Sequence, residues 1–289
     1  MKLIEVIKRE KPGLSFEVFP PKTWDKLDSV IATTEKIAKL EPTYMSVTYG
    51  AGGGTSDYTV KIAKNLKDNC KIEPLAHLTC VSSSRERVHS QLDLLKDAGI
   101  ENILALRGDL VAGMDMNNLE YRYASQLIYD IKDYMGDAFC IGGACYPEGH
   151  PECPSITEDI RHLKEKVDAG CEFLTTQMFF ENHLLYRFLD RIEGAGITAP
   201  VVAGIMPVTN PNTIKRTMMI SGTEMPRRII EMVEKYEHDP DDLKSAGIEY
   251  ATEQIIDLYE HGVNAVHVYC MNKPDVAERI KSNVSEYLK

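Results

Sequence analysis

Glu17 is an acidic residue in a segment whose neighbours are apolar. It lies in LSFEVFPPK, residues 14–22, between Phe16 and Val18. If the segment is a strand, Glu17 points to the face opposite these two side chains. A carboxyl group buried there would raise its pKa and keep its proton unless a charged partner held it. The following prolines end the strand, which leaves two interpretations: an acid at a strand-end active site, or one half of an ion pair in the core.

Polar or conformationally special residues also stand near the carboxyl ends of other apolar segments. They are Thr48, Tyr49, His77, Thr79, Arg107, Gly108, Asp109, Tyr146, Glu148, His150, Gln177, Pro207, Thr209, Asn210, Asn272 and Lys273. Singly, some fit plain structural roles: Arg107 with Asp109 as a local ion pair, and His77 as a core histidine whose ring nitrogen finds a carbonyl. Together they form a ring of the kind that lines the active rim of a parallel barrel, and this ring favours an enzyme.

Apolar, β-branched segments alternate with amphipathic ones along the whole chain. The expected strands are residues 14–20, 43–50, 72–80, 101–109, 138–147, 173–180, 201–208 and 265–272. Helices are expected between them, for example at 25–40, 84–98 and 156–169, with two or three more in 211–262 around a polar turn near 238–242. Gly99 and Gly170 stand where a left-handed helix cap is wanted. Strict alternation without a low-complexity linker predicts an α/β fold, a single (β/α)8 TIM barrel over residues 1–289.

The glycine-rich segment GAGGGT, residues 50–55, bears on a competing fold, the doubly wound sheet. It follows one strand and opens a helix, as a dinucleotide-binding fingerprint does. The next strand, however, ends in His77, Leu78, Thr79 and Cys80, with no acidic residue to bind a ribose. We therefore expect the glycines to let a loop lie against a ligand or to make a tight turn.

The composition excludes several classes of partner. The chain has 289 residues and a formal net charge of -11, so no basic face is available to neutralise the phosphates of nucleic acid or an anionic membrane. Its longest apolar runs are strand-sized, and residues 1–11 are charged and periodic like a surface helix rather than a cleavable leader. We expect a cytoplasmic protein with no nucleic-acid or membrane partner.

Seven cysteines stand singly, with no C-x-x-C pair. Reduced thiols are therefore expected. The nearest approach to a metal site, Cys145 and Cys153 with His150, matches none of the usual ligand spacings, so no metal is predicted.

Seven segments in register give a more specific signal. They are LSFEVFPPK, MSVTYGAGG, AHLTC, LALRGD, CYPEGHPE, FLTTQMFF and AGIMPVTN. In this order and at these spacings, the chain resembles the 5,10-methylenetetrahydrofolate reductases, flavoenzymes of one-carbon metabolism, over essentially its whole length. The resemblance implies a (β/α)8 barrel with FAD on its carboxyl rim. It also implies reduction of 5,10-methylenetetrahydrofolate to 5-methyltetrahydrofolate, with electrons from NADH or NADPH passing through FAD.

The resemblance also implies roles for residues of this chain. Glu17 would be the general acid that protonates N10 of the folate, and Asp109 a charge that stabilises the cationic intermediate. Substrate contacts are implied for Glu17, Thr48, Asp109, Gln177 and Lys273. FAD contacts are implied for Thr48, Tyr49, Ala51, His77, Arg107, Gly108, Asp109, Ala124, Tyr146, His150, Asp159 and Lys166. Of these, Arg107 and Lys166 are natural counterions of the pyrophosphate.

The chain departs from the family pattern at three of its positions. Glu165 stands where relatives have arginine, His162 where asparagine is common, and Lys273 where arginine is common. The first two concern the adenine or diphosphate side of the flavin, and the third concerns the tail of the folate. The chain stops one helix after the last expected strand, so no C-terminal regulatory domain and no inhibition by S-adenosylmethionine are expected.

The assembly of the protein and its electron donor leave alternatives open. The resemblance implies a homo-oligomer. The barrel could instead be a subunit of a larger complex that receives electrons through an iron–sulfur partner and cannot use NAD(P)H by itself. A metal-dependent lyase on the same fold is a further alternative, which the lack of a convincing ligand set disfavours.

Overall fold

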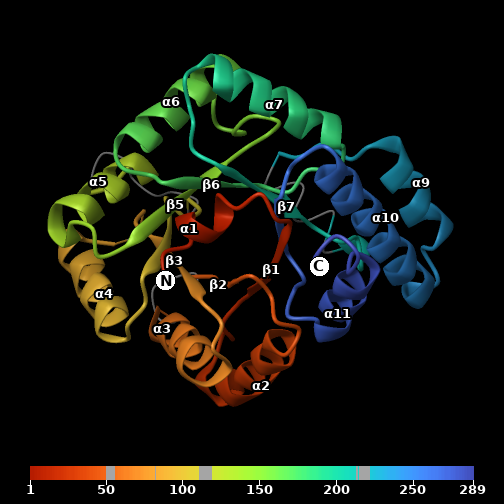
Figure 1. Ribbon diagram of the computed structural model, residues 1–289, viewed down its shortest axis with the longest axis horizontal. Coiled ribbons are helices and arrows are strands. Elements are labelled where there is room, and N and C mark those ends of the chain that lie inside the picture. The colour runs from red at the N-terminus through yellow and green to blue at the C-terminus, as the bar shows by residue number, and fades with distance from the viewer. Residues whose placement is uncertain (50–55, 82, 111–118, 213, 215–221) are drawn as a thin grey trace.

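Eight parallel strands close into a barrel in the order of the chain, from β1 to β8. The computed structural model describes residues 1–49, 56–81, 83–110, 119–212, 214 and 222–289. The strands are β1 (Gly13–Val18), β2 (Met45–Val47), β3 (Pro74–Thr79), β4 (Asn102–Leu106), β5 (Cys140–Cys145), β6 (Phe173–Thr176), β7 (Val201–Ile205) and β8 (Ala265–Val268). β8 pairs with β1 and closes the ring (Figure 1). The predicted (β/α)8 barrel is confirmed, and the doubly wound sheet is excluded because such a sheet has open edges.

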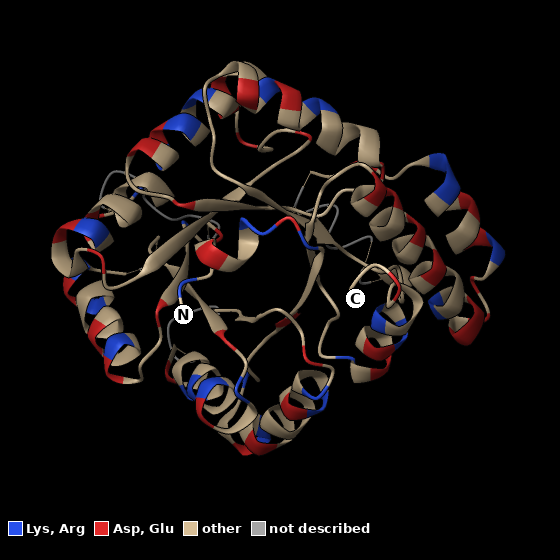
Figure 2. Cartoon of the chain, in the orientation of Figure 1, with Lys and Arg blue, Asp and Glu red and all other residues tan. Residues whose placement is uncertain are grey.

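At least one helix follows each strand and packs outside the barrel (Figure 1). After β1 to β6 come α2 (Leu27–Ala38), α3 (Ser56–Asn65), α4 (Arg85–Asp97), α5 (Ala124–Met135), α6 (Ile156–Asp168) and α7 (Asn182–Gly194). α9 (Arg227–Lys235) and α10 (Pro240–Glu260) follow β7, α11 (Pro274–Asn283) follows β8, and two short helical turns are η1 (Trp24–Lys26) and η2 (Leu66–Cys70). Charged residues are spread over these helices, as Figure 2 shows. The strands form the apolar inner layer that such a fold requires.

The predicted helices agree with the structure more closely than the predicted strands do. The segments 84–98 and 156–169 match α4 and α6, and Gly99 and Gly170 follow them with φ of 73° and 116°, a conformation that favours glycine. The strands end earlier than predicted. For example, the segment 173–180 is a strand only to Thr176, although Met178, Phe179 and Phe180 are buried. Apolar residues continue past the last strand pairing because the rim loops also pack into the core, so hydrophobicity alone overestimates strand length.

Side chains of the strands alternate between the helices and the barrel interior. Leu14, Phe16 and Val18 of β1 belong to the main core, which lies between the strands and the helices. Inside the barrel, Gly204 of β7 leaves room for Tyr269, because a Cβ at Gly204 would lie 2.4 Å from the Tyr269 hydroxyl oxygen. That hydroxyl donates a hydrogen bond to the Thr176 carbonyl at 2.6 Å. The barrel interior is therefore filled by side chains, as in other barrels of this size.

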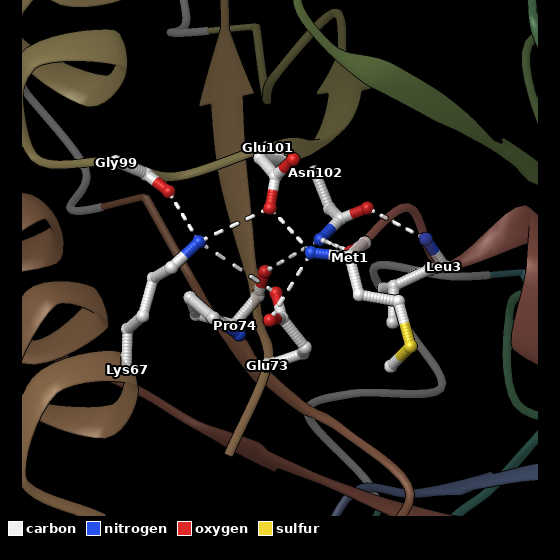
Figure 3. Close-up of polar contacts among 8 residues, drawn as sticks. All are labelled: Met1, Leu3, Lys67, Glu73, Pro74, Gly99, Glu101 and Asn102. Atoms are coloured by element: carbon white, nitrogen blue, oxygen red, sulfur yellow. Dashed lines mark hydrogen bonds and ion pairs between the residues drawn. The ribbon is translucent and has the colours of Figure 1, made fainter. Parts of the chain in front are cut away.

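The first residues of the chain close the amino end of the barrel. α1 (Ile4–Ile7) lies across this mouth (Figure 1), and Leu3 and Ile7 are buried against side chains at the beginnings of the strands. The Leu3 backbone N–H donates to Asn102 Oδ1 at 2.7 Å, and Asn102 Nδ2 donates to the Met1 carbonyl at 3.1 Å (Figure 3). The helix expected over residues 1–11 is therefore shorter than predicted, since only residues 4–7 are helical, and it has one buried face. The apolar side chains of this segment cover an opening that the outer helices leave uncovered.

Two further findings concern the described residues only. All seven cysteines are free thiols, and five of them are buried. Among the helices in the described part of the chain, none is both long and apolar enough to cross a membrane.

Candidate active site

Glu17 is the sole Asp, Glu, Lys or Arg residue within the eight described strands. It stands one residue before the end of β1, at the carboxyl rim, with its Cα paired to Ser46 of β2. Its side chain is 17% exposed. Burial raises its pKa from an ordinary 4.5 to about 8, because a carboxylate is poorly solvated there. At neutral pH this group is therefore mostly the protonated acid.

His77 of β3 faces Glu17 across the barrel interior. The distance from His77 Nε2 to Glu17 Oε2 is 3.8 Å, which is too long for a hydrogen bond. Burial lowers the pKa of His77 to about 4, so between about pH 4 and pH 8 both groups are uncharged. His77 Nε2 is buried and makes no hydrogen bond to any described residue. The pair is thus not the core ion pair that the sequence left open, but two neutral groups with unused hydrogen-bonding capacity.

A second histidine lies below Glu17 and was not singled out from the sequence. His267 of β8 contacts Ser15 Oγ through Nδ1 at 2.7 Å and Ser46 Oγ through Nε2 at 2.9 Å. Because Ser15 Oγ donates to the Val266 carbonyl at 3.0 Å, the consistent assignment has His267 Nδ1–H donating to Ser15 and Ser46 donating to Nε2. Burial lowers the pKa of His267 to about 3, so the ring is neutral. The signal in the sequence was a polar residue in the apolar run AVHV.

Arg107 is held at the carboxyl end of β4 by an acidic partner from another loop. Its Nη1 and Nη2 donate to the two carboxylate oxygens of Glu152 at 2.6 and 2.8 Å. This pairing raises the pKa of Arg107. Gly108 follows with φ of 90°, and a Cβ there would lie 3.1 Å from Thr79 Cβ, so the turn requires glycine. Asp109 is exposed and close enough to Arg107 to raise its pKa further, although the partner of Arg107 is Glu152 and not the Asp109 of the simple ion-pair interpretation.

The loop after β5 brings several of the predicted cofactor residues together. The His150 ring packs edge-on against Tyr146, with ring centroids 4.6 Å apart, and the His150 N–H donates to Asp159 Oδ2 at 3.1 Å. Asp159 lies in the first turn of α6, and burial raises its pKa. Lys166 Nζ donates to the Ala144 carbonyl, and burial lowers the pKa of this lysine. The lysine therefore reaches from the last turn of α6 to β5, where its ammonium group is bound to backbone.

The remaining predicted residues are spread along the same rim. Thr48 follows β2, its N–H donating to the Val18 carbonyl at 3.0 Å, and Tyr49 comes next. Gln177 follows β6, and its Oε1 accepts the Met178 N–H at 2.9 Å. Ala124 is the first residue of α5. Ala51 lies outside the described residues.

Lys273 lies at another part of the rim, after β8 and beside the residues that follow β7. Its Nζ donates to Thr209 Oγ1 at 2.9 Å. Both residues line a cavity of about 150 Å³ at the ends of β7 and β8. Neighbouring Lys244 lowers the pKa of Lys273, and burial lowers it more. Thr209 was named from the sequence only as a rim residue, and the structure makes it the hydrogen-bond partner of the predicted substrate lysine.

The residues present fit a phosphorylated flavin better than a metal. Arg107 and Lys166 supply two cationic groups, and His77 Nε2 offers a buried hydrogen-bonding atom without a partner among the described residues. Within the described part of the chain, no cluster of three or more His, Cys, Asp or Glu residues could hold a metal ion. The donor set suits an anion and a polar heterocycle.

Comparison with known proteins identifies the family. The sequence profile of the methylenetetrahydrofolate reductases matches residues 2–285. The 5,10-methylenetetrahydrofolate reductase of Escherichia coli is 34% identical over 268 residues, which cover 93% of this chain and 89% of that protein. This chain belongs to the methylenetetrahydrofolate reductase family.

Some relatives in the family are much longer than this chain. The methylenetetrahydrofolate reductase (NADH) 1 of Arabidopsis thaliana is 32% identical over 98% of this chain but only 51% of its own length. The chain thus spans about half the length of this plant relative. Among solved structures, a Clostridium thermocellum protein described as binding two copies of 5-methyl-5,6,7,8-tetrahydrofolic acid superposes with a TM-score of 0.70 at 16% identity, covering 99% of both chains. That likeness supports the barrel fold.

Proposed function

We propose that this protein is a flavin-dependent reductase that converts 5,10-methylenetetrahydrofolate to 5-methyltetrahydrofolate, with NADH or NADPH as the electron donor. The observation that carries the proposal is the protonated Glu17 at the carboxyl rim, with a pKa of about 8. It is the group that the reaction of this family requires, held in its acid form at neutral pH. Membership of the family supplies the reaction and the substrate class.

Glu17 would act on the folate as a general acid. The methylene bridge of the substrate joins N5 and N10 and resists reduction while its ring is closed. Protonation of N10 lets the bond between N10 and the bridging carbon break, and the open form is an iminium cation at N5 whose methylene carbon accepts the hydride. A carboxylic acid with a pKa near the working pH gives up its proton readily and regains it after turnover.

FAD, when bound, would supply the hydride for this step. The side chains of Arg107 and Lys166 would hold its pyrophosphate, with Tyr146, His150 and Asp159 in the same loop region. His77 Nε2 would donate to or accept from the bound ligands, since no described residue satisfies it. The uncharged state of His77 and His267 keeps positive charge away from Glu17, and this helps to preserve its proton.

Four further residues would contact the folate. The exposed carboxylate of Asp109 would stabilise the cationic intermediate and accept hydrogen bonds from the pterin. The Gln177 amide, after β6, would contact the pterin, and Thr48, after β2, would contact the substrate from another part of the rim. Lys273, beside its cavity, would bind a carboxylate of the folate tail. We further propose that the protein is cytoplasmic and that it forms a homo-oligomer, as the family resemblance implies.

Flavin spectroscopy tests the proposal on the full chain. The purified protein should be yellow, anaerobic NADH or NADPH should bleach the flavin, and 5,10-methylenetetrahydrofolate should restore the colour. A protein that takes up no FAD would refute the proposal. A flavin that resists both nicotinamides but is bleached by a chemical reductant, and then reoxidised by the folate, would instead indicate a barrel that depends on an iron–sulfur partner.

A further inference from the structure

The guanidinium group of Arg107 is fully hydrogen-bonded, and its main partner is the Glu152 carboxylate. The two terminal nitrogens of the guanidinium donate to the Glu152 carboxylate at 2.6 and 2.8 Å, and Nε donates to the Gly108 carbonyl at 3.4 Å. Each guanidinium nitrogen therefore already has an acceptor. Glu152 is not among the residues to which the sequence assigned a role, although it ends the segment CYPEGHPE.

The loop between β5 and α6 holds this carboxylate in place. The Glu152 N–H donates to His150 Nδ1 at 3.1 Å, and the His150 N–H donates in turn to Asp159 Oδ2 at 3.1 Å. Gly149, with φ of 91°, makes the turn, and its N–H donates to the Tyr146 carbonyl at 3.0 Å. The backbone of Glu152 is therefore held by the loop, and only its side chain has to move for the carboxylate to leave Arg107.

The two partners differ in burial. The side chain of Arg107 is 18% exposed, whereas that of Glu152 is 50% exposed. Glu152 can therefore turn out to water while Arg107 stays in the site. A guanidinium fork binds a carboxylate and a phosphate with the same geometry, so the two anions compete for the same N–H groups.

We propose that Glu152 is an internal anion that occupies Arg107 until the diphosphate of the flavin displaces it, and that it thereby limits the affinity of the site for phosphorylated flavins. This inference rests on the proposed function, because it takes FAD as the ligand. Displacing a carboxylate that is already paired costs part of the energy gained from the diphosphate. The exchange should make bound FAD releasable, and it should leave uncharged flavins unaffected.

The substitution Glu152→Gln tests this on the full chain. The amide keeps the size of the side chain but removes its charge, so Arg107 becomes free to bind phosphate. The dissociation constant of FAD, measured by quenching of flavin fluorescence, should fall about five- to tenfold, as expected for the loss of a competing, partly exposed ion pair. The rate of FAD release should fall as well. Riboflavin, which has no phosphate, should bind the variant and the parent protein equally.

Glu158→Gln is the matched control. Glu158 lies in the first turn of α6 and pairs with Arg161 and His162, so its loss removes one negative charge from the same region without touching Arg107. FAD affinity should change less than twofold in this variant. An equal gain in both variants would show a general charge effect and overturn the proposal.

The remaining outcomes separate this inference from the proposed function. Weaker FAD binding in Glu152→Gln would show that Glu152 orients Arg107 for the diphosphate, which also overturns the proposal. Equal FAD binding in the variant and the parent would overturn it too, while leaving the flavin reductase intact. If the parent protein binds neither FAD nor riboflavin, the proposed function itself fails, and the inference fails with it.

Discussion

Two buried polar sites, Asn102 near the amino end of the barrel and Glu17 with His77 near its carboxyl end, differ in how far their hydrogen bonds are satisfied. At the amino end, buried Asn102 accepts from the Leu3 N–H and donates to the Met1 and Pro74 carbonyls at 3.1 and 3.4 Å. At the carboxyl end, Glu17 and His77 face each other at 3.8 Å, and His77 Nε2 has no hydrogen-bond partner in the described parts of the chain. The polar groups of Asn102 therefore contribute to stability, whereas the Glu17 site keeps a hydrogen-bonding atom available to a ligand.

Leaving a buried polar group without a hydrogen-bond partner has a cost in stability, and this cost indicates which of the two sites is functional. A buried polar group without a partner destabilises the folded state by roughly 1–3 kcal/mol, so such groups persist in proteins where a ligand or a reaction needs them. Asn102 incurs no such cost, because its amide oxygen and its amide nitrogen both have hydrogen-bond partners. These bonds connect the first residues of the chain to β4. His77 Nε2 does incur the cost, and the same buried site keeps the Glu17 carboxyl in its acid form at neutral pH.

The largest expected effect comes from removing the acid at the carboxyl end. In Glu17→Gln the side chain keeps its size but cannot release a proton to N10. Reoxidation of the reduced flavin by 5,10-methylenetetrahydrofolate should slow about a hundredfold or more, the usual contribution of a general acid. Reduction of the flavin by NADH or NADPH needs no such proton and serves as the internal control in rapid-mixing experiments. If both half-reactions slow equally, Glu17 is structural, and the contrast between the two ends disappears.

The next effect should be confined to stability. Asn102→Ala removes the side chain that joins β4 to Met1 and Leu3 and leaves the buried Leu3 N–H without its acceptor. Urea unfolding should show a loss of about 2–3 kcal/mol, while the dependence of folate reduction on Glu17 stays unchanged. The control is Asn69→Ala, at an exposed asparagine bonded only to nearby Asn65, with an expected loss below about 0.5 kcal/mol. A large loss of folate reduction in folded Asn102→Ala would show that the amino end also serves the chemistry.

The smallest expected effect is a dependence of folate reduction on pH, which should arise from Glu17 at the carboxyl end. The acid form of Glu17 is the active one and has a pKa of about 8, so it is present below that pH and is lost as the pH rises through it. Folate reduction should therefore be flat from about pH 6 to pH 7.5 and fall about tenfold per pH unit well above 8. Reduction of the flavin by NADH should lack this decline. A folate half-reaction that already falls between pH 4 and 6 would mean an ordinary carboxylate pKa.

Alternating strands and helices, read from hydrophobic periodicity and glycine caps, were sufficient to predict the barrel and the residues of its rim. The rim could be listed because strands of one direction end on one side, whatever their exact pairing. Glu17 stood out for a local reason, since a charged residue between Phe16 and Val18 is costly in any strand. The sequence by itself therefore determined the architecture and its acidic residue.

Only the tertiary structure decided which rim residues meet. Glu17 and His77 come from β1 and β3, and Arg107 and Glu152 are 45 residues apart, so no local pattern records these distances. The bonds of His267 to Ser15 and Ser46 likewise depend on the closure of β8 onto β1. What the helix near residues 1–11 packs against was not predictable for the same reason, because the opening that Leu3 and Ile7 fill exists only once the ring is closed. Periodicity encodes which face a side chain takes, whereas barrel register and closure decide what stands opposite it.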